Sequence, residues 1–233
     1  MRLLLFDIDG TLLGTDGAGR RAIHRALMDH AGTPGVVPGY RLDGKTDPQI
    51  VRELLALGGH PRHEDRALVG EICERYVTHL AEELARSGQA TRAMPGVPAL
   101  LQALEPLEDR GQVMVGLLTG NVAGGAALKL RAAGLRPERF AVGAYGLDGH
   151  HRPDLPPVAL ARAAERLGRP VRGADTWIIG DTPADVACGR PVGARALAVA
   201  TGSYRVEELR ETGAELVFAD LSDTDAVLRG LDL

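Results

Sequence analysis

The stretch LLLFDIDGT, residues 3–11, decides the fold. Its apolar residues are followed by two carboxylates, Asp7 and Asp9, which flank a single isoleucine. A short apolar run that ends in polar residues is typical of a buried parallel strand, and we expect one over Leu3–Ile8. Residues two apart on an extended segment face the same side, about 6–7 Å apart, so both carboxylates should project from the carboxyl end of this strand.

Similar apolar runs recur along the chain, with helical patterns between most of them. This alternation predicts repeated β-α units and a doubly wound parallel sheet. The further strands are expected at Val113–Leu118, Thr176–Ile179, Ala196–Ala200 and Leu216–Phe218, and the helices between them at Ala123–Ala133, Val158–Leu167 and Ala184–Cys188.

Residues 15–92 break this alternation, because they show helix-like patterns without a convincing strand. We expect a helical insertion here, connected by two segments rich in small or helix-breaking residues, Gly14–Gly19 and Gly88–Gly96. The chain would then consist of a core, residues 1–14 and 93–233, and a helical domain, residues 15–92. The helices of the insertion are expected at Ala22–His30, Pro48–Leu57 and Glu64–Ala85.

Composition excludes several classes of function. The formal charge is −4 and only 3% of residues are aromatic, so neither nucleic acid nor an anionic membrane surface is an expected partner. Two cysteines, Cys73 and Cys188, make no disulfide framework and favour a reducing compartment. Asp7 and Asp9 interrupt the N-terminal apolar run too early for a signal peptide or membrane span, and we expect a cytoplasmic protein.

Asp7 and Asp9 are the first candidates for chemistry. Two carboxylates placed so closely raise each other's pKa unless a cation or a shared proton relieves them, which implies a metal for one and a proton role for the other. Open α/β sheets bind their ligands at this end of the strands. The structural alternative is a pair of turn-capping aspartates before Gly10.

A second motif, Thr119-Gly120-Asn121, follows the Val113–Leu118 strand. The threonine hydroxyl and the backbone amides that open the next helix suit a phosphate oxygen. Taken alone, an N-cap formed by Asn121 explains the motif at least as well.

A third motif places Arg152 before Pro153, ahead of a helix. The prolines fix the entry to that helix, and the guanidinium could grip phosphate oxygens with two parallel hydrogen bonds. A surface arginine beside a proline is the alternative.

The fourth motif, Gly180-Asp181-Thr182-Pro183-Ala184-Asp185, follows the Thr176–Ile179 strand. Thr182 and Asp185 suit the N-cap and third positions of the next helix, so Asp185 has a structural explanation as a cap. Asp181 has none. A carboxylate there would complete a Mg²⁺ site with Asp7, and Asp185 could contact the metal directly or through water.

In order and spacing, these four motifs resemble those of the haloacid dehalogenase superfamily over essentially the whole chain, with greatest similarity to hydrolases of the phosphoglycolate-phosphatase type. The resemblance implies a three-layer Rossmann-like α/β core with a parallel sheet, a smaller mobile helical cap inserted after the first strand, and an aspartyl-phosphate intermediate. It implies Asp7 as nucleophile and Asp9 as the acid and base. Thr119, Gly120, Asn121 and Arg152 would hold the phosphoryl group, and Mg²⁺ would bind Asp7, the Asp9 backbone carbonyl, Asp181 and Asp185.

One position departs from the family pattern, because the third motif usually supplies a lysine where this chain has Arg152. An arginine keeps the charge but is not equivalent to a compact ammonium. The chain has only two lysines, Lys45 and Lys129. Neither is an obvious substitute, since Lys45 belongs to the cap and Lys129 lies well inside the helix after Thr119. We expect Arg152 to perform the role.

The cap carries a polar loop, Asp43–Asp47, that could close over the site and contact the leaving group of the substrate. Arg41, Lys45 and Thr46 are the candidate contacts. An ordinary capped turn, with Thr46 or Asp47 as the cap, is an equally good explanation.

The sequence thus predicts a Mg²⁺-dependent phosphatase acting on a small phosphorylated metabolite such as phosphoglycolate, a sugar phosphate or a nucleotide. A phosphomutase on the same core is an alternative, as is a catalytically idle phosphate-binding protein, since fold does not guarantee activity. A phosphonate-cleaving enzyme would need a cap lysine, for which Lys45 is available. The oligomeric state stays open.

Overall fold

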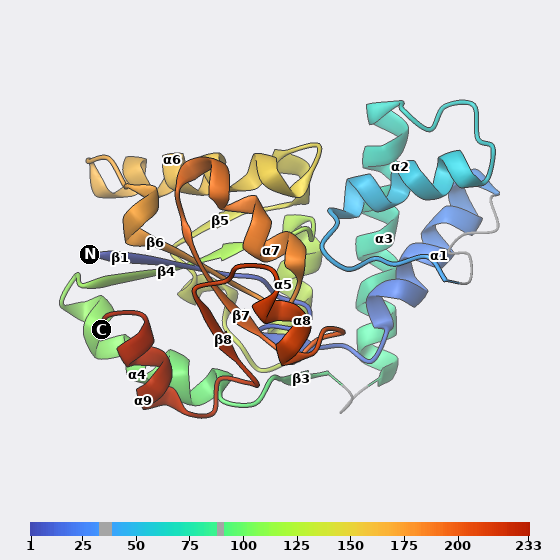
Figure 1. Cartoon of the computed structure of the whole chain (residues 1–233). Helices are drawn as coiled ribbons and strands as arrows, with labels where there is room; N and C mark the ends of the chain where they lie inside the picture. The colour runs from blue at the N-terminus through green and yellow to red at the C-terminus, as the bar shows by residue number, and fades with distance from the viewer. Residues whose placement is uncertain (33–38, 88–90) are drawn as a thin grey trace.

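The computed structural model describes residues 1–32, 39–87 and 91–233. A parallel sheet with helices on both faces forms the larger part, and three helices form a smaller unit beside the carboxyl ends of the strands (Figure 1). This arrangement confirms the α/β class and the parallel sheet predicted from the sequence. Residues 88–90 of the second expected connection lie outside the described residues.

The sheet has six strands in the order β5-β4-β1-β6-β7-β8. The first strand is therefore central, and Leu4 of β1 pairs with Val115 on one side and with Trp177 on the other. The order reverses at β1, which makes its carboxyl end the place where such a sheet binds ligands. The strands are β1 (Arg2–Phe6), β4 (Val113–Leu118), β5 (Val142–Ala144), β6 (Thr176–Gly180), β7 (Arg195–Val199) and β8 (Leu216–Phe218).

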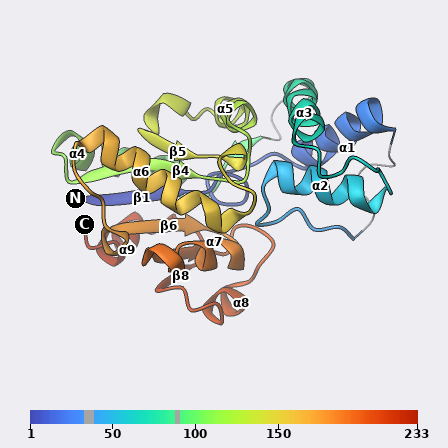
Figure 2. The same cartoon turned by 90° about the horizontal axis from the view of Figure 1, so that it is seen from above.

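Alternate residues of each strand pack on opposite faces, because side chains alternate along an extended backbone. Leu4 and Phe6 of β1 face α4 (Val97–Asp109), α5 (Ala123–Ala132) and α9 (Thr224–Gly230). Leu3 and Leu5 face α6 (Leu155–Leu167) and α7 (Pro183–Cys188). The short helix α8 (Val206–Arg210) packs through Leu209 on Ala196 and Ala198 of β7. Three layers result, with α6 above the strands and α4 and α9 below them in Figure 1. Figure 2, seen from above, shows α6 lying over the strands and α1, α2 and α3 beside them.

The smaller unit consists of α1 (Ala18–Ala31), α2 (Asp47–Leu57) and α3 (Arg66–Ser87), and we call it the helical unit. It has its own apolar core, which includes Leu27, Leu54 and Ile72. Two chain segments join it to the sheet, and they pair as a short antiparallel ribbon of β2 (Leu13–Gly14) and β3 (Arg92–Ala93).

The helical unit packs on the core through α3 and α5. Glycines on α5 permit the close approach, since a Cβ on Gly124 would lie 3.3 Å from Val77 and one on Gly125 would lie 3.4 Å from Tyr76. Val122, just before α5, belongs to the apolar core of the helical unit. The contact places α3 directly over the start of the helix that follows the second motif.

The structure differs from the sequence-based expectation in several details. Helices α4, α8 and α9 were not predicted, and α1 and α6 begin earlier than expected. Strand β1 ends at Phe6 rather than Ile8, because the Ile8 carbonyl accepts turn hydrogen bonds from Leu12 N (2.9 Å) and Leu13 N (3.0 Å). Asp9 therefore lies on a turn rather than on an extended strand, and Asp7 is the first residue after β1. Strand β5 was not predicted, since three residues around Gly143 carry no periodicity that a pattern search can detect.

Among the described residues, no helix combines the length and the apolar character that a bilayer crossing requires. Cys73 and Cys188 are both buried and form no disulfide.

Candidate active site

Asp7 is the first residue after the central strand, and its backbone N–H still donates to Ile179 O of β6 (2.9 Å). This bond fixes the residue at the junction of two strands, where its side chain is 6% exposed. Burial raises the pKa of Asp7 to about 6, and the carboxylates of Asp185 and Asp9 contribute to the rise, while the charge of Arg152 opposes it. Asp7 thus needs nearby positive charge to be an anion at neutral pH.

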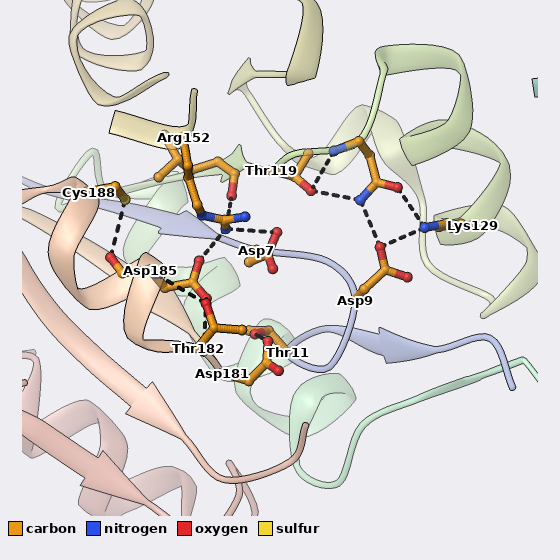
Figure 3. Close-up of polar contacts among 12 residues, drawn as sticks. Asp7, Asp9, Thr11, Thr119, Lys129, Arg152, Asp181, Thr182, Asp185 and Cys188 are labelled. Carbon is orange, nitrogen blue, oxygen red and sulfur yellow. Dashed lines mark hydrogen bonds and ion pairs between the residues drawn. The ribbon is translucent and has the colours of Figure 1, made fainter. Parts of the chain in front are cut away.

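Arg152 supplies part of that charge. It lies in a single 3-10 turn before α6, is 4% exposed, and places Nη2 3.2 Å from Asp7 Oδ1. The same nitrogen contacts Asp185 Oδ1, so one guanidinium lies between two buried carboxylates (Figure 3). Burial disfavours the charged guanidinium, but Asp185 and Asp7 outweigh it and raise the pKa of Arg152. Arg152 Nε is buried without a hydrogen-bond partner among the described residues.

Asp181 follows β6 and faces Asp7. Its Oδ1 accepts a hydrogen bond from Thr11 Oγ1 (3.0 Å), which holds the carboxylate at the turn after β1. Gly10, with φ +82°, makes that turn possible, since a Cβ there would lie 2.3 Å from Asp181 Oδ2. Burial, followed by the charges of Asp185 and Asp7, raises the pKa of Asp181 to about 9.

Asp185 combines two roles. Thr182 and Asp185 form the predicted capping box, in which Asp185 Oδ2 accepts from Thr182 N (3.0 Å) and Oγ1 (2.6 Å). Asp185 Oδ1 contacts Arg152 instead. Carboxylate oxygens of Asp7, Asp181 and Asp185 all lie within 4.8 Å of one another, which is the spacing of ligands around one metal ion.

Thr119 and Asn121 lie opposite this acidic cluster, after β4. Thr119 is completely buried, and its Oγ1 accepts from Asn121 Nδ2 (2.8 Å). Asn121 Nδ2 also donates to Asp9 Oδ2 (2.8 Å). The second motif therefore does more than cap a helix, because it connects the position after β4 with one of the two aspartates after β1.

Lys129 also lies in this site, although we did not expect it there. It is on α5, as its position in the sequence indicated, but its side chain reaches back so that Nζ lies 2.6 Å from Asp9 Oδ2 and 2.6 Å from Asn121 Oδ1. Asp9 thus has a cation of its own, separate from the Arg152 that contacts Asp7. Helical periodicity does not predict this contact. The one indication in the sequence is that Lys129 belongs to α5, the helix that directly follows the second motif.

These residues surround a cavity of about 190 Å³ between the core and the helical unit. The volume is that of a site for a small molecule rather than for a protein surface. The core contributes Asp7, Asp9, Thr119, Lys129, Arg152 and Asp181, and the helical unit with its connecting loops contributes Gly19, Arg20, Ile23, Lys45, Ile50 and Tyr76.

Two hydrogen bonds hold the helical unit against the second motif. Asp47 N donates to Gly120 O (2.7 Å), and Val122 N donates to Asp47 Oδ2 (2.8 Å). The Asp47 carboxylate thereby occupies the amino terminus of α5, where negative charge is favourable. Gly120 must lack a side chain, because a Cβ there would lie 2.0 Å from Lys45 O.

The three candidate contacts in the helical unit take different positions. Lys45 lines the cavity, with Nζ bound to Glu53 (2.5 Å) and to the Tyr40 hydroxyl (3.1 Å). Thr46 is fully buried as the N-cap of α2, where Oγ1 accepts from Gln49 N (3.2 Å). Arg41 pairs with Asp43 and lies over the Tyr204 ring, and neither Arg41 nor Thr46 is among the residues that line the cavity.

Chemically, the arrangement offers one buried carboxylate, one half-exposed carboxylate and cationic groups around one small cavity. Asp7 is held by Arg152, whereas Asp9 is half exposed to the cavity and held by Lys129. Two carboxylates with separate partners can take separate roles in one reaction.

Solved structures with this architecture include hydrolases and phosphatases. A hydrolase from Pseudomonas syringae is 21% identical, with a TM-score of 0.71 and 98% of each chain covered. CbbY from Rhodobacter sphaeroides, solved in complex with phosphate, is 21% identical, with a TM-score of 0.68 and full coverage of both chains. A predicted phosphoglycolate phosphatase from Haemophilus somnus is 16% identical, with a TM-score of 0.64 and 97% of each chain covered. At these identities the similarity establishes the fold.

No protein with curated annotation matches the sequence. The family model described as haloacid dehalogenase-like hydrolase matches residues 4–190, a span that contains all four motifs and the helical unit. The resemblance inferred from the motifs is thereby confirmed, and the chain belongs to the haloacid dehalogenase-like hydrolase family.

Proposed function

We propose that this protein is a Mg²⁺-dependent phosphatase that hydrolyses a small organic phosphate monoester through a phosphorylated Asp7. The observation that carries the proposal is the position of Asp7, buried at the end of the central strand, in contact with Arg152 and across a small cavity from Asp9. The membership in a hydrolase family supports the reaction class. The unpaired buried thiols, Cys73 and Cys188, agree with a cytoplasmic location.

In the first step, a carboxylate oxygen of Asp7 attacks phosphorus and the bond between phosphorus and the ester oxygen breaks. Asp9 gives its proton to the departing alcohol, so that the leaving group departs without charge. The result is an aspartyl phosphate on Asp7 and an ionised Asp9. Splitting the reaction in this way replaces one difficult displacement with two easier ones.

In the second step, Asp9 accepts a proton from water, and the resulting nucleophile attacks the phosphorus of the aspartyl phosphate. This regenerates Asp7 and releases inorganic phosphate. The Arg152 guanidinium and the Thr119 hydroxyl, both of which belong to residues that line the cavity, are the donors that we propose for the phosphoryl oxygens. Such fixed donors act on the charge that spreads over these oxygens in the transition state.

The acidic cluster fits a divalent cation. Asp7, Asp181 and Asp185 would hold it, together with the Asp9 backbone carbonyl, and oxygen ligands of this kind suit Mg²⁺. The raised pKa values of Asp7 and Asp181 support the assignment, because three buried carboxylates share a single arginine. When bound, the cation would neutralise charge on the transferring phosphoryl group.

A small substrate follows from the cavity. The helical unit covers the site, so we propose that it is a cap over the core and that residues 15–92 form a separate domain. A cavity of about 190 Å³ is small for a phosphoprotein loop, whereas phosphoglycolate, a sugar phosphate or a nucleotide suits the proposal better. Lys45 lines the cavity and is the cap residue that we propose to contact the leaving group.

Replacing Asp7 tests the nucleophile. Asp7→Asn should lower Mg²⁺-dependent phosphate release from p-nitrophenyl phosphate and from a panel of small phosphate esters by at least about 10⁴-fold, the scale expected when a nucleophile is lost. Asp109→Asn, an exposed aspartate at the end of α4, should match the wild type. Full activity in Asp7→Asn would contradict the mechanism, and phosphate transfer stimulated by a bisphosphate with little net release would favour a mutase.

The Arg152 assignment has its own test. Arg152→Ala should lower kcat/KM by about 10²–10³-fold, because it removes both the partner of Asp7 and a phosphate donor. Arg152→Lys keeps a cation and should be at least about tenfold more active than the alanine variant. Steady-state kinetics of both purified variants give the comparison, and equal rates would mean that another group holds the phosphate.

Replacing Asp181 should change both the pH dependence of protein stability and the response of stability to a metal ion. Since its pKa is raised to about 9 in the folded protein and is about 3.9 in an unfolded chain, the folded state holds an extra proton between these values. The free energy of unfolding therefore falls as pH rises through this range. In EDTA at pH 8, Asp181→Asn should raise Tm by several degrees relative to the wild type, with a smaller difference at pH 5.

The same pair of proteins tests the cation. Added MgCl₂ at pH 8 should raise Tm of the wild type and of the Asp109→Asn control, because ligand binding to the folded state stabilises it. Asp181→Asn should lose most of this response. An equal rise in Asp181→Asn, or no rise in the wild type, would place the metal elsewhere or exclude it.

A further inference from the structure

Lys129 is buried next to Asp9 rather than next to the phosphate-binding groups. Its residue exposure is 4%, and Nζ donates to Asp9 Oδ2 and Asn121 Oδ1, both at 2.6 Å. Asn121 Nδ2 donates to the same Asp9 oxygen at 2.8 Å. The three side chains form a closed triangle in which each contacts the other two, as Figure 3 shows for Asp9 and Lys129.

The triangle restrains one oxygen of Asp9 and leaves the other for the substrate. Both hydrogen bonds to the Asp9 carboxylate, in the described part of the chain, end on Oδ2. The side chain is 43% exposed and lines the cavity. A carboxylate on a turn would otherwise rotate freely about its side-chain bonds, so these two donors determine where Oδ1 lies relative to the cavity.

The helical unit covers the triangle from outside. A Cβ on Gly19 of α1 would lie 3.4 Å from Lys129 Nζ and 3.6 Å from the Tyr76 hydroxyl of α3. Burial disfavours the ammonium, but Asp9, Tyr76 and Asp47 outweigh it and raise the pKa of Lys129. The ammonium is thus enclosed between α5 and the helical unit, and Asp9 Oδ2 is the carboxylate oxygen bonded to it.

We propose that Lys129 is a positioning residue that fixes Asp9 so that Oδ1 meets the ester oxygen of the leaving group. The proposal rests on the proposed phosphatase function. In the first step, Asp9 transfers a proton to that oxygen as the bond to phosphorus breaks, and Lys129 touches neither substrate nor phosphorus. Its effect should therefore scale with how much the leaving group needs a proton.

Leaving-group dependence separates this role from a structural one. The p-nitrophenolate ion leaves without protonation, whereas the alkoxide of an alkyl phosphate does not. The ratio kcat/KM covers only the steps up to phosphorylation of Asp7, so the later attack by water does not affect it. Lys129→Met removes the ammonium while keeping most of the length of the side chain.

In Lys129→Met, kcat/KM for the best alkyl phosphate should fall by about 100-fold, the cost of a misplaced catalytic group. The value for p-nitrophenyl phosphate should change by less than about threefold, since general acid catalysis contributes little there. Arg131→Met also replaces a cationic side chain of α5 by methionine, but at an exposed residue, and it should leave both kcat/KM values unchanged. Lys129→Gln keeps a donor and provides a second variant with the same expected pattern, weaker in size.

An equal loss on both esters would assign Lys129 to stability or to phosphate binding and would overturn the proposal. No loss on either ester would do the same, as would failure of both Lys129 variants to fold, because a structural role would then suffice. A wild type that hydrolyses no phosphate ester would instead contradict the proposed function itself.

Discussion

The electrostatic repulsion among Asp7, Asp181 and Asp185 is the constraint on which the site depends. Their carboxylate oxygens lie within 4.8 Å of one another in a buried place, and burial with mutual repulsion raises the pKa of Asp7 to about 6 and that of Asp181 to about 9. Buried carboxylates at this distance are expensive unless cations compensate them. Arg152 compensates two of the three, and the remaining demand is what a divalent cation would satisfy.

The second aspartate of the first motif lies outside this cluster, and the difference between the two supports the separate roles that we propose for them. Asp7 is directed to Arg152, whereas Asp9 is directed to Lys129. The helical unit takes part in both arrangements, since it encloses the cavity and covers the ammonium of Lys129. Asp47, placed on the amino terminus of α5, holds that unit against the core. The contact between the helical unit and α5 therefore covers the site and also encloses Lys129, which we propose orients Asp9.

The sequence predicted much of this because its motifs directly follow buried strands, and strand ends converge in a parallel sheet. Asp7, Thr119 and Asp181 each follow such a strand, so their proximity could be expected. The contacts of Lys129 could not be predicted. Its long side chain reaches a partner 120 residues away, and periodicity records only which face of a helix is apolar. The contact of Asp47 with the start of α5 could not be predicted either, because periodicity does not record which residues of two distant segments meet. Strand β5 has only three residues, which is too short for a pattern to detect.

The proposed mechanism requires phosphorylation of Asp7, and direct detection of the acyl phosphate tests it. Asp9→Asn removes the base for the second step but not the nucleophile, so with p-nitrophenyl phosphate and Mg²⁺ the intermediate should accumulate. After rapid acid quenching, peptide mass spectrometry should find one phosphoryl group per chain, on the peptide that contains Asp7 and lost on treatment with hydroxylamine. Release of p-nitrophenol without phosphate on Asp7, or with phosphate on another residue, would contradict the account.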